Sequence, residues 1–447
     1  METAEKTSNE TPELDVPASP SPTLAPSKNG HAVRIEPDLN FIRELRRRSR
    51  DSYKKCIQCG TCSATCTISP DKDPFPRKEM AWAVWGMKDL LVRDPDIWLC
   101  YQCSDCSVRC PRGARPGDIL AGVRQEAIRH FAAPRFLGKW VSSPRYLPIL
   151  LGLPAVMLGL LLYFKNPIAD ALGIGNLMEG RIVYSYSSTF PHWMLNAFFF
   201  FFSMLAVVAV ITGVVRLWRA MKFTVAQDGS FEPVKGIWAS IGAALKSVVA
   251  HDYFSTCTAA RSRYLAHVCF FFGFLALTMV TIWVITSGFN ALTGKHFSYP
   301  FNFWNPWKML ANIGGAAVLF GCGLTIRDRL VDDKDIGHGS YGDWALVLGL
   351  FFVVVSGFAT ELLHYVRLEP HRHIVYFIHL IFVFALLIYL PYSKFAHIIY
   401  RATAMVFAEH TGRRLQAAPP LEELQEITQD EPAVETQSVA EPERSEV

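Results

Sequence analysis

Residues 56–66 read CIQCGTCSATC, and residues 100–110 read CYQCSDCSVRC. In each stretch four cysteines follow the spacing C-x2-C-x2-C-x3-C, and Pro111 comes directly after the second stretch. Eight of the eleven cysteines in the chain belong to these two stretches. The repeated spacing indicates one small domain built around two equivalent loops.

The doubled spacing is typical of bacterial ferredoxins that carry two [4Fe–4S] clusters. Three closely spaced cysteines reach three iron corners of one cluster, and the fourth cysteine of the run ligates the other cluster. Zinc would need only two separated C-x2-C pairs, and disulfides belong to oxidising compartments. Since a cysteine occupies every iron corner, we expect the domain to conduct electrons and not to catalyse a reaction. The expected ligands are Cys56, Cys59, Cys62 and Cys110 for the first cluster, and Cys100, Cys103, Cys106 and Cys66 for the second.

The composition places the rest of the chain in a membrane. Hydrophobic residues make up 51% of the 447 residues. Charged residues make up 19%, below the ~25% of soluble domains. Residues 194–215 and 264–289 contain no Asp, Glu, Lys or Arg, and about 20 apolar residues suffice for a helix to cross the hydrocarbon core. Purely soluble, collagen-like and wholly disordered classes are excluded. The net charge of +4 gives no argument for nucleic-acid binding.

The predicted fold is mainly α, with four regions along the chain. Tails at residues 1–37 and 401–447 are rich in proline or acidic residues and are expected to be disordered. Residues 38–130 form a cysteine domain, and residues 131–400 form a transmembrane domain. Helices are expected in the cysteine domain over 41–50, 77–92 and 116–130, and spans over 146–164, 193–216, 264–289, 308–326, 343–366 and 374–396.

Loop charge predicts the orientation, because loops on the cytoplasmic side carry an excess of Lys and Arg. The membrane loops and flanks on the side of the cysteine domain hold 17 Lys and Arg, against 6 in the loops on the other side. Six crossings with both termini in the cytoplasm follow. We therefore expect a multi-pass protein of the cytoplasmic membrane with its cysteine domain inside.

Histidines within the spans are candidate ligands of haem b, because a polar ring in a bilayer is costly and usually functional. His379 and His397 are 18 residues apart. In one continuous helix this is five turns and ~27 Å, so both rings would lie on one face, near opposite membrane surfaces. His267 would pair with His397 at an inner haem. The expected partner of His379 at an outer haem is His364, with His192 as the alternative, and the choice between one and two haems stays open.

The alternative for these histidines is an interfacial ring bonded to headgroups or water, and it applies most to His192, His371 and His373. Glu361 lies three residues before His364, so it could carry protons to or from a quinone, or could be capped by Arg367 or Arg372. We expect the remaining polar candidates to be solvated (His251, His338, His410) and the remaining cysteines to pack (Cys257, Cys269, Cys322).

These residues carry a resemblance to known electron-transfer families. The cysteine domain resembles the small iron–sulfur subunit of heterodisulfide reductase. The membrane half resembles the haem b subunits of that enzyme and of respiratory nitrate reductase (the gamma subunit). In the latter, the ligands come from helices equivalent to the third and sixth spans, which implies His267, His379 and His397. The family's second histidine on the earlier helix falls on Leu277 here.

The fusion of both modules resembles the C subunit of the quinone-interacting membrane-bound oxidoreductase, or Qmo, complexes. The similar stretch is WLCYQCSDCSVRCPRGARPGDIL at 98–120, and the resemblance covers roughly 41–400. It implies two flavin- and iron–sulfur-containing partners (the A and B subunits) in a bacterial or archaeal inner membrane. It also implies an indirect link to adenylylsulfate (APS) reductase in dissimilatory sulfur metabolism.

The predicted function is electron transfer, in either direction, between the quinone pool and cytoplasmic partner subunits. This makes the chain one component of an oxidoreductase and not a complete enzyme. A heterodisulfide-reductase-like or sulfite-reductase-linked complex is the alternative within the same class. A transporter with a redox sensor and a ferredoxin domain on a haem-free anchor are alternatives outside it.

Overall fold

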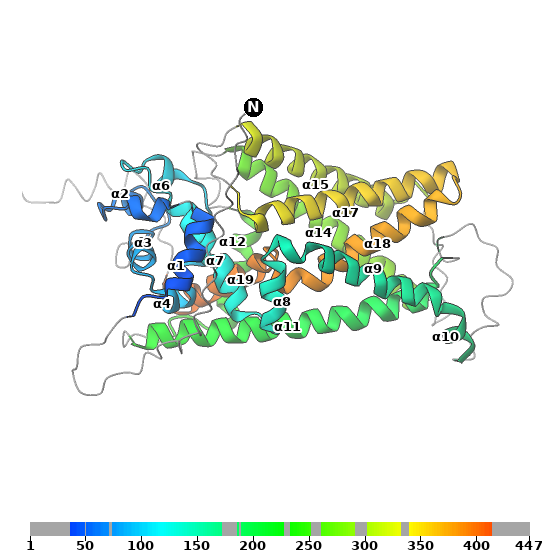
Figure 1. Ribbon diagram of the computed structural model, residues 1–447, viewed down its shortest axis with the longest axis horizontal. Helices are drawn as coiled ribbons and strands as arrows, with labels where there is room; N and C mark the ends of the chain where they lie inside the picture. The colour runs from blue at the N-terminus through cyan, green and yellow to red at the C-terminus, as the bar shows by residue number, and fades with distance from the viewer. Residues whose placement is uncertain are drawn as a thin grey trace, which may run out of the picture.

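The computed structural model describes residues 36–49, 51–70, 74–171, 186, 189–227, 233–251, 261–290, 302–331 and 339–413. Within these ranges every regular element is a helix, which confirms the mainly α prediction. Nearly all of the expected N-terminal tail lies outside the described residues, as do residues 414–447. The cysteine domain lies at one end of the molecule, and the long helices run away from it along the longest axis (Figure 1).

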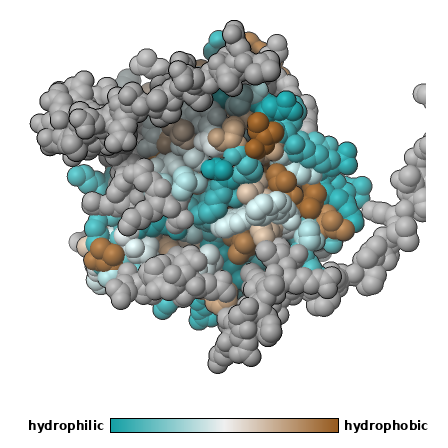
Figure 2. All heavy atoms as spheres, turned by 90° about the vertical axis from the view of Figure 1, so that its left-hand side faces the viewer, coloured by the Kyte–Doolittle hydropathy of each residue, from teal (hydrophilic) through white to brown (hydrophobic). Residues whose placement is uncertain are grey.

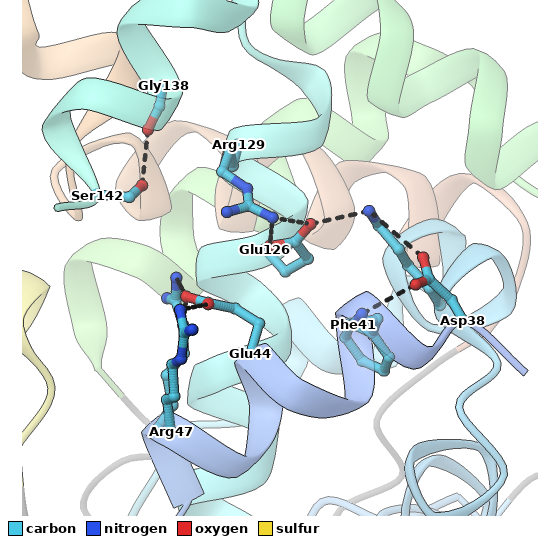
Figure 3. Close-up of polar contacts among 10 residues, drawn as sticks. Asp38, Phe41, Glu44, Arg47, Glu126, Arg129, Gly138 and Ser142 are labelled. Atoms are coloured by element: carbon cyan, nitrogen blue, oxygen red, sulfur yellow. Dashed lines mark hydrogen bonds and ion pairs between the residues drawn. The ribbon is translucent and has the colours of Figure 1, made fainter. Parts of the chain in front are cut away.

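Helix α7 is the central helix of the cysteine domain. Its residues Ile119, Val123 and Ala127 are fully buried, and Phe41 and Leu45 of α1 belong to the same core. Figure 3 shows the two helices side by side, with Glu126 of α7 accepting from Arg129. The helices of the domain are α1 (Leu39–Ser49), η1 (Ser52–Lys55), α2 (Thr61–Ala64), α3 (Arg77–Val84), α4 (Lys88–Arg93), α5 (Asp96–Leu99), α6 (Asp105–Val108) and α7 (Pro116–Phe131).

The single helix predicted over 77–92 is wrong, since α3 and α4 are separate helices. Gly86 lies between them with φ of 71°. A Cβ on this glycine would lie 2.6 Å from Cδ1 of Ile42. The left-handed backbone and the close approach of α1 both require glycine here, and the turn ends the helical run. Helices α1 and α7 agree with the two other predictions to within two residues.

Six helical segments are long and apolar enough to cross a membrane, as predicted from the sequence. The long helices are α9 (Leu147–Tyr163), α11 (His192–Gln227), α14 (Arg261–Asn290), α15 (Pro306–Val331), α17 (Tyr341–Val366) and α18 (His371–Tyr389), which continues through η6 (Leu390–Tyr392) into α19 (Ala396–His410). Shorter helices are α8 (Arg135–Val141), η2 (Pro144–Tyr146), α10 (Lys165–Ala171) and α12 (Ile237–Ala250). We call the long helices the bundle, and its two ends the domain end and the far end.

The last span is not one continuous helix, which corrects the geometry assumed for His379 and His397. Helix α18 stops at Tyr389, a short 3-10 turn contains Pro391, and α19 begins at Ala396. Proline lacks the N–H that a helix interior needs and clashes with the preceding turn. The shared face and the ~27 Å separation of the two rings therefore do not follow from their spacing.

The cysteine domain and the bundle share one hydrophobic core. Leu217 and Met221 of α11 are buried in the same cluster as Phe41, and so are Tyr400 and Phe407 of α19. Trp98 and Tyr400 place their ring centroids 5.2 Å apart across this junction. The described part of the domain is thus built onto α11 and α19.

Helix α19 also corrects the boundary expected at residue 401. The helix continues to His410, and Ala404, Phe407 and Ala408 within this extension are buried. Arg413 follows and pairs with Asp96 of α5 at 2.5 Å. Residues 401–413 therefore belong to the folded protein, because their apolar face completes the core of the cysteine domain.

Candidate functional site

The two cysteine loops have the same backbone conformation. Gln58 and Gln102 follow the first cysteine of each run by two residues and have φ of 60° and 56°. Gly60 and Ser104 follow the second cysteine directly and have φ of 81° and 74°. Left-handed residues of this kind coil the chain tightly, and side chains other than glycine adopt them at a cost that marks functional loops. The repeat in sequence is therefore also a repeat in structure.

The first loop and one distant cysteine line a common pocket. Cys56, Cys59 and Cys62 lie around it together with Cys110, which comes from the other loop. This is the first set expected from the spacing. Arg77 and Arg112 also line the pocket, and the Cys59 thiol is 3.3 Å from the Thr61 hydroxyl.

The second pocket holds the complementary set of cysteines. Cys100, Cys103 and Cys106 line it with Cys66 from the first loop. The backbone N–H of Gln102 donates to Sγ of Cys100 at 3.3 Å, a bond that would stabilise negative charge on a ligating sulfur. Each set thus draws three cysteines from one loop and one from the other, as the spacing predicted.

The crowding of thiols makes both pockets suited to metal. Burial raises the pKa of Cys62 to about 11, and the neighbouring Cys56 adds to this rise. Burial likewise raises the pKa of Cys66 to about 12, with Cys100 and Cys103 contributing. All described cysteines are free thiols. Because a bound metal ion compensates the charge of thiolates that otherwise repel each other, these donor sets fit cubane clusters; their assignment as ligands stays a prediction.

The two sets differ in their surroundings. Cys59 of the first set is exposed, and the pocket of this set is also lined by two exposed arginines, Arg77 and Arg112. Cys106 of the second set is buried, and its loop faces α14 and α19 of the bundle. Figure 2 shows this end of the molecule as a mainly hydrophilic surface with separate apolar patches.

At the domain end of the bundle the structure brings two predicted haem ligands together. His267 of α14 and His397 of α19 interact electrostatically. Nδ1 of His397 lies 2.5 Å from the carbonyl oxygen of Lys394. A carbonyl only accepts, so Nδ1 carries the proton and Nε2 keeps its lone pair for a metal. This arrangement fits a haem ligand.

A third histidine at this end was missed. His251 was expected in a solvated loop, but it ends α12 and is only 7% exposed. Its ring centroid lies 5.2 Å from that of His267, and its Nδ1 donates to the carbonyl of Val249 at 3.1 Å. The sequence offers no local signal for this position, since only the packing of α12 on α19 brings His251 there. His410, also expected in solvent, is half-buried and bonds to the carbonyl of Lys235 at 2.7 Å.

Toward the far end, His379 lies against α17. Its Nδ1 donates to the carbonyl of Val353 at 3.1 Å and lies 3.0 Å from the Ser356 hydroxyl. A Cβ at Gly357 would lie 3.1 Å from Cε1 of the ring, so the glycine makes room for it. The protonated Nδ1 again leaves Nε2 as the ligating atom, as a haem would require.

The partner of His379 stays open. His364 lies seven residues beyond Gly357, or ~10 Å along α17, and its ring centroid is 5.6 Å from that of Tyr186. His373 contacts the same tyrosine. His192 begins α11, but its side chain lies outside the described residues, as do His338 and Cys257. The remaining cysteines, Cys269 and Cys322, lie in α14 and α15, and Cys322 is buried in an apolar cluster.

Glu361 has partners that sequence reasoning missed. Lys308 of α15 forms an ion pair with it at 2.9 Å, and the Asn312 amide donates to it at 3.3 Å. Arg372, one of the two expected caps, pairs with Glu369 at 2.6 Å. A charged lysine and a carboxylate at the far end of the bundle form a polar site near His364.

Comparison with known proteins identifies both parts of the chain. Residues 52–114 match the 4Fe-4S dicluster domain family, and residues 150–419 match the family described as citrate utilization protein B. The C subunit of the H(2):CoB-CoM heterodisulfide,ferredoxin reductase of Methanothermobacter marburgensis is 35% identical over 99 residues, which cover 22% of this chain and 53% of that protein. The C subunit of the ferredoxin:CoB-CoM heterodisulfide reductase of Methanosarcina acetivorans is 36% identical over 74 residues, or 17% of this chain and 30% of that protein.

The third relative extends over most of the chain. Citrate utilization protein B of Escherichia coli is 26% identical over 376 residues, covering 78% of this chain and 88% of that protein. The chain spans about half the length of the first heterodisulfide reductase relatives, or less. No solved structure matches. The N-terminal part is therefore an iron–sulfur electron-transfer module like the C subunit of heterodisulfide reductase, joined to six helical segments that are long and apolar enough to cross a membrane. Since its family match covers more than half of the sequence, the chain belongs to the citrate utilization protein B family.

Proposed function

We propose that this protein transfers electrons between the membrane quinone pool and soluble partner subunits, using two [4Fe–4S] clusters and haem b. One observation carries the proposal. The two complementary cysteine sets lie at the end of the helices that hold His267 and His397, which supports a single folded unit for the predicted cluster ligands and the predicted haem ligands. When bound, these groups supply one-electron carriers, which is the chemistry that links a quinone to a soluble redox partner.

Residues of this chain would hold each electron carrier at its place between the soluble partner and the membrane. The first cysteine set would hold one cluster near the surface, and the second set would hold the other within the junction with the bundle. His267 and His397 would hold one haem at the domain end. His379, with Nδ1 bonded to Val353, would hold the other haem, with His364 or His192 as its partner.

Glu361 would hold and release protons for the quinone. Its carboxylate is half-buried and bonded to Lys308 and Asn312, so it stays oriented while exchanging a proton. We expect Glu361→Gln to slow haem reduction by quinol, because the amide cannot accept the proton. Glu369→Gln is the matched control, since this exposed glutamate lies at the same end and pairs with Arg372. Equal slowing in both variants would contradict a role in proton transfer.

The excess of Lys and Arg in the loops on the domain side supports a cytoplasmic cysteine domain. The exposed Cys59, with the exposed Arg77 and Arg112 lining the same pocket, would face a partner with an acidic surface. In the sulfur-metabolism version of the proposal, this partner is a pair of flavin and iron–sulfur subunits of the Qmo type, linked to APS reductase. A heterodisulfide-reductase-like complex would use the same face.

The family favours a second candidate for the partner. The match to the citrate utilization protein B family covers nearly the whole bundle, and the Escherichia coli relative is named for citrate utilization. A flavoprotein that oxidises citrate or a related carboxylic acid would then deliver electrons to the same route, with quinone as acceptor.

The test is a redox-monitored spectrum of the anaerobically purified protein, with iron analysis and a pyridine haemochrome assay. Two cubane clusters require about eight iron atoms per chain beyond the haem iron. Reduced quinol added to the protein in vesicles should reduce the haem. Cys62→Ser and Cys106→Ser should each remove one cluster signal and leave the other. Absence of b-type haem, or loss of both signals in each variant with folding intact, would refute the proposal.

A further inference from the structure

Two arginines of the bundle hold the loop of the second cysteine set. Arg401 of α19 donates to the carbonyls of Cys100 at 3.0 Å and Leu99 at 3.2 Å. Its guanidinium also stacks over the ring of Tyr101, 3.8 Å from the centroid. Planar guanidinium groups suit such combined bonding and stacking, and an ammonium group cannot reproduce it.

Arg263 of α14 reaches the same loop from a second helix. It donates at 2.9 Å both to the carbonyl of Gln102 and to the hydroxyl of Ser104. Gln102 and Ser104 are the two residues with positive φ that give this loop its tight coil. Arg263 and Arg401 therefore fix the residues that shape the second cysteine set, and they do so from separate spans.

Each of these arginines lies close in sequence to one of the histidines predicted to bind haem. Arg263 precedes His267 by four residues, and Arg401 follows His397 by four residues. Residues four apart in a helix lie on one face, about 6 Å apart along the axis. On both helices, the arginine that binds the loop and the predicted haem ligand thus share a face and lie one turn apart.

The first cysteine set has the opposite surroundings. Cys59 is exposed and Ile57 beside it is 60% exposed. The two pockets are therefore not interchangeable with respect to the bundle, although their loops have the same conformation.

We propose that Arg263 and Arg401 are positioning residues that fix the second cysteine set next to His267 and His397. This makes the second set the membrane end of the electron route, and the first set its partner end. The assignment of the two sets to the membrane end and the partner end rests on the proposed function. Both arginines also bring positive charge to the second cluster, which favours its reduced form and raises its reduction potential.

The experiment uses the purified holoprotein with Arg263→Ala and Arg401→Ala, and with Arg401→Lys as the conservative variant. Arg216→Ala is the matched control. Arg216 of α11 also binds two backbone carbonyls of the domain, those of Phe131 and Ala132 at 3.3 and 2.9 Å, but it touches neither cysteine loop. Iron and haem contents are measured first, so that a variant that fails to assemble is recognised.

Redox titrations followed by electron paramagnetic resonance separate the two clusters, with signals assigned by Cys62→Ser and Cys106→Ser. We expect both alanine variants to shift the potential of the second cluster to a lower value and to leave the first unchanged. Arg401→Lys should keep the potential, because it keeps the charge. Haem reduction by prereduced clusters should slow in both alanine variants, because each variant loses two hydrogen bonds that hold the loop beside the histidines. Arg216→Ala should change neither quantity.

Two outcomes would overturn the inference. Fully assembled alanine variants with the wild-type potential and rate would show that the arginines serve only the fold. A shift of the first cluster in place of the second would show that the order of the two sets is reversed. If the wild-type protein binds no haem, the proposed function fails, but the selective shift of the second cluster still tests the inference.

Discussion

The replacement Glu79→Gln should stabilise the cysteine domain at pH 8, because Glu79 belongs to a buried group with more negative than positive charge. Glu79, Asp94 and Asp96 are all nearly inaccessible, and their carboxylates lie within 4.8 Å of one another. The Lys78 ammonium is 3.0 Å from Asp96 and 3.1 Å from Asp94, but 3.6 Å from Glu79. Arg413 pairs with Asp96, and neither carboxylate oxygen of Glu79 has a hydrogen-bond partner.

These contacts set the sign of the pH dependence. Burial raises the pKa of Glu79, and the nearby Asp94 and Asp96 raise it further. The folded state therefore binds a proton at Glu79 that the unfolded state releases near its ordinary pKa of 4.5. Stability is lost as the pH rises above that value toward the folded pKa. Asp96 behaves oppositely: burial disfavours its charge, but Arg413 and Lys78 lower its pKa overall, so its contribution is lost as the pH falls.

At pH 8 the folded protein must either bury the charge of Glu79 or take up a proton there, and either costs about 1–3 kcal/mol or more. A neutral amide of the same shape removes that cost. We expect Glu79→Gln to raise the free energy of unfolding at pH 8 by about 1–3 kcal/mol and to have little effect near pH 4.5. The assay is denaturation of the protein in nanodiscs at both pH values, followed by the absorbance of the bound clusters. Glu44→Gln is the control, since this half-buried carboxylate pairs with Arg48 at 2.7 Å. Its loss should cost up to about 1 kcal/mol at pH 8. A less stable Glu79→Gln at pH 8 would refute the reasoning, because it would show an ionised Glu79 paired with Lys78.

Three further changes test the junction, the histidines and the helix packing. Phe407→Ala should destabilise the protein by about 3–5 kcal/mol, because Phe407 is fully buried in the shared core; limited proteolysis should then release the cysteine domain, and wild-type resistance would argue against a shared core. His267→Ala and His397→Ala should each lose the same haem in the pyridine haemochrome assay, while His379→Ala should spare it; loss of different haems in the first two would contradict their pairing. Gly273→Val should lower the thermal midpoint, since a Cβ there would lie 2.7 Å from a backbone oxygen of α15; an unchanged midpoint would show that the two helices can separate at no cost.

Features set by local chemistry could be predicted from the sequence. The cysteine spacing fixes which sulfurs can share a pocket, and the structure forms both sets as expected. Long runs without charged residues predict membrane spans, because a helix that crosses the hydrocarbon core needs predominantly apolar side chains. The helix break at Pro391 was visible in the sequence, but the apolar residues around it favoured one continuous span.

Features set by packing between distant segments could not be predicted. His251 lies against His267 only because α12 packs on α19. Lys308 forms an ion pair with Glu361 from another helix, and the separation of the two residues along the chain does not predict this pair. The continuation of α19 to His410 depends on burial against the cysteine domain, and the local sequence of residues 401–410 does not show that this burial occurs.

The shared core has a consequence for the order of events during synthesis. The cysteine domain begins near residue 38, but Tyr400 and Phe407 complete its apolar interior. During synthesis the residues of this domain therefore emerge before its core is complete. The predicted spans are all synthesised before α19 can supply the last buried residues of that core. Since domains generally fold as units, we expect cluster insertion into a stable domain to be a late step, which follows insertion of the bundle into the membrane.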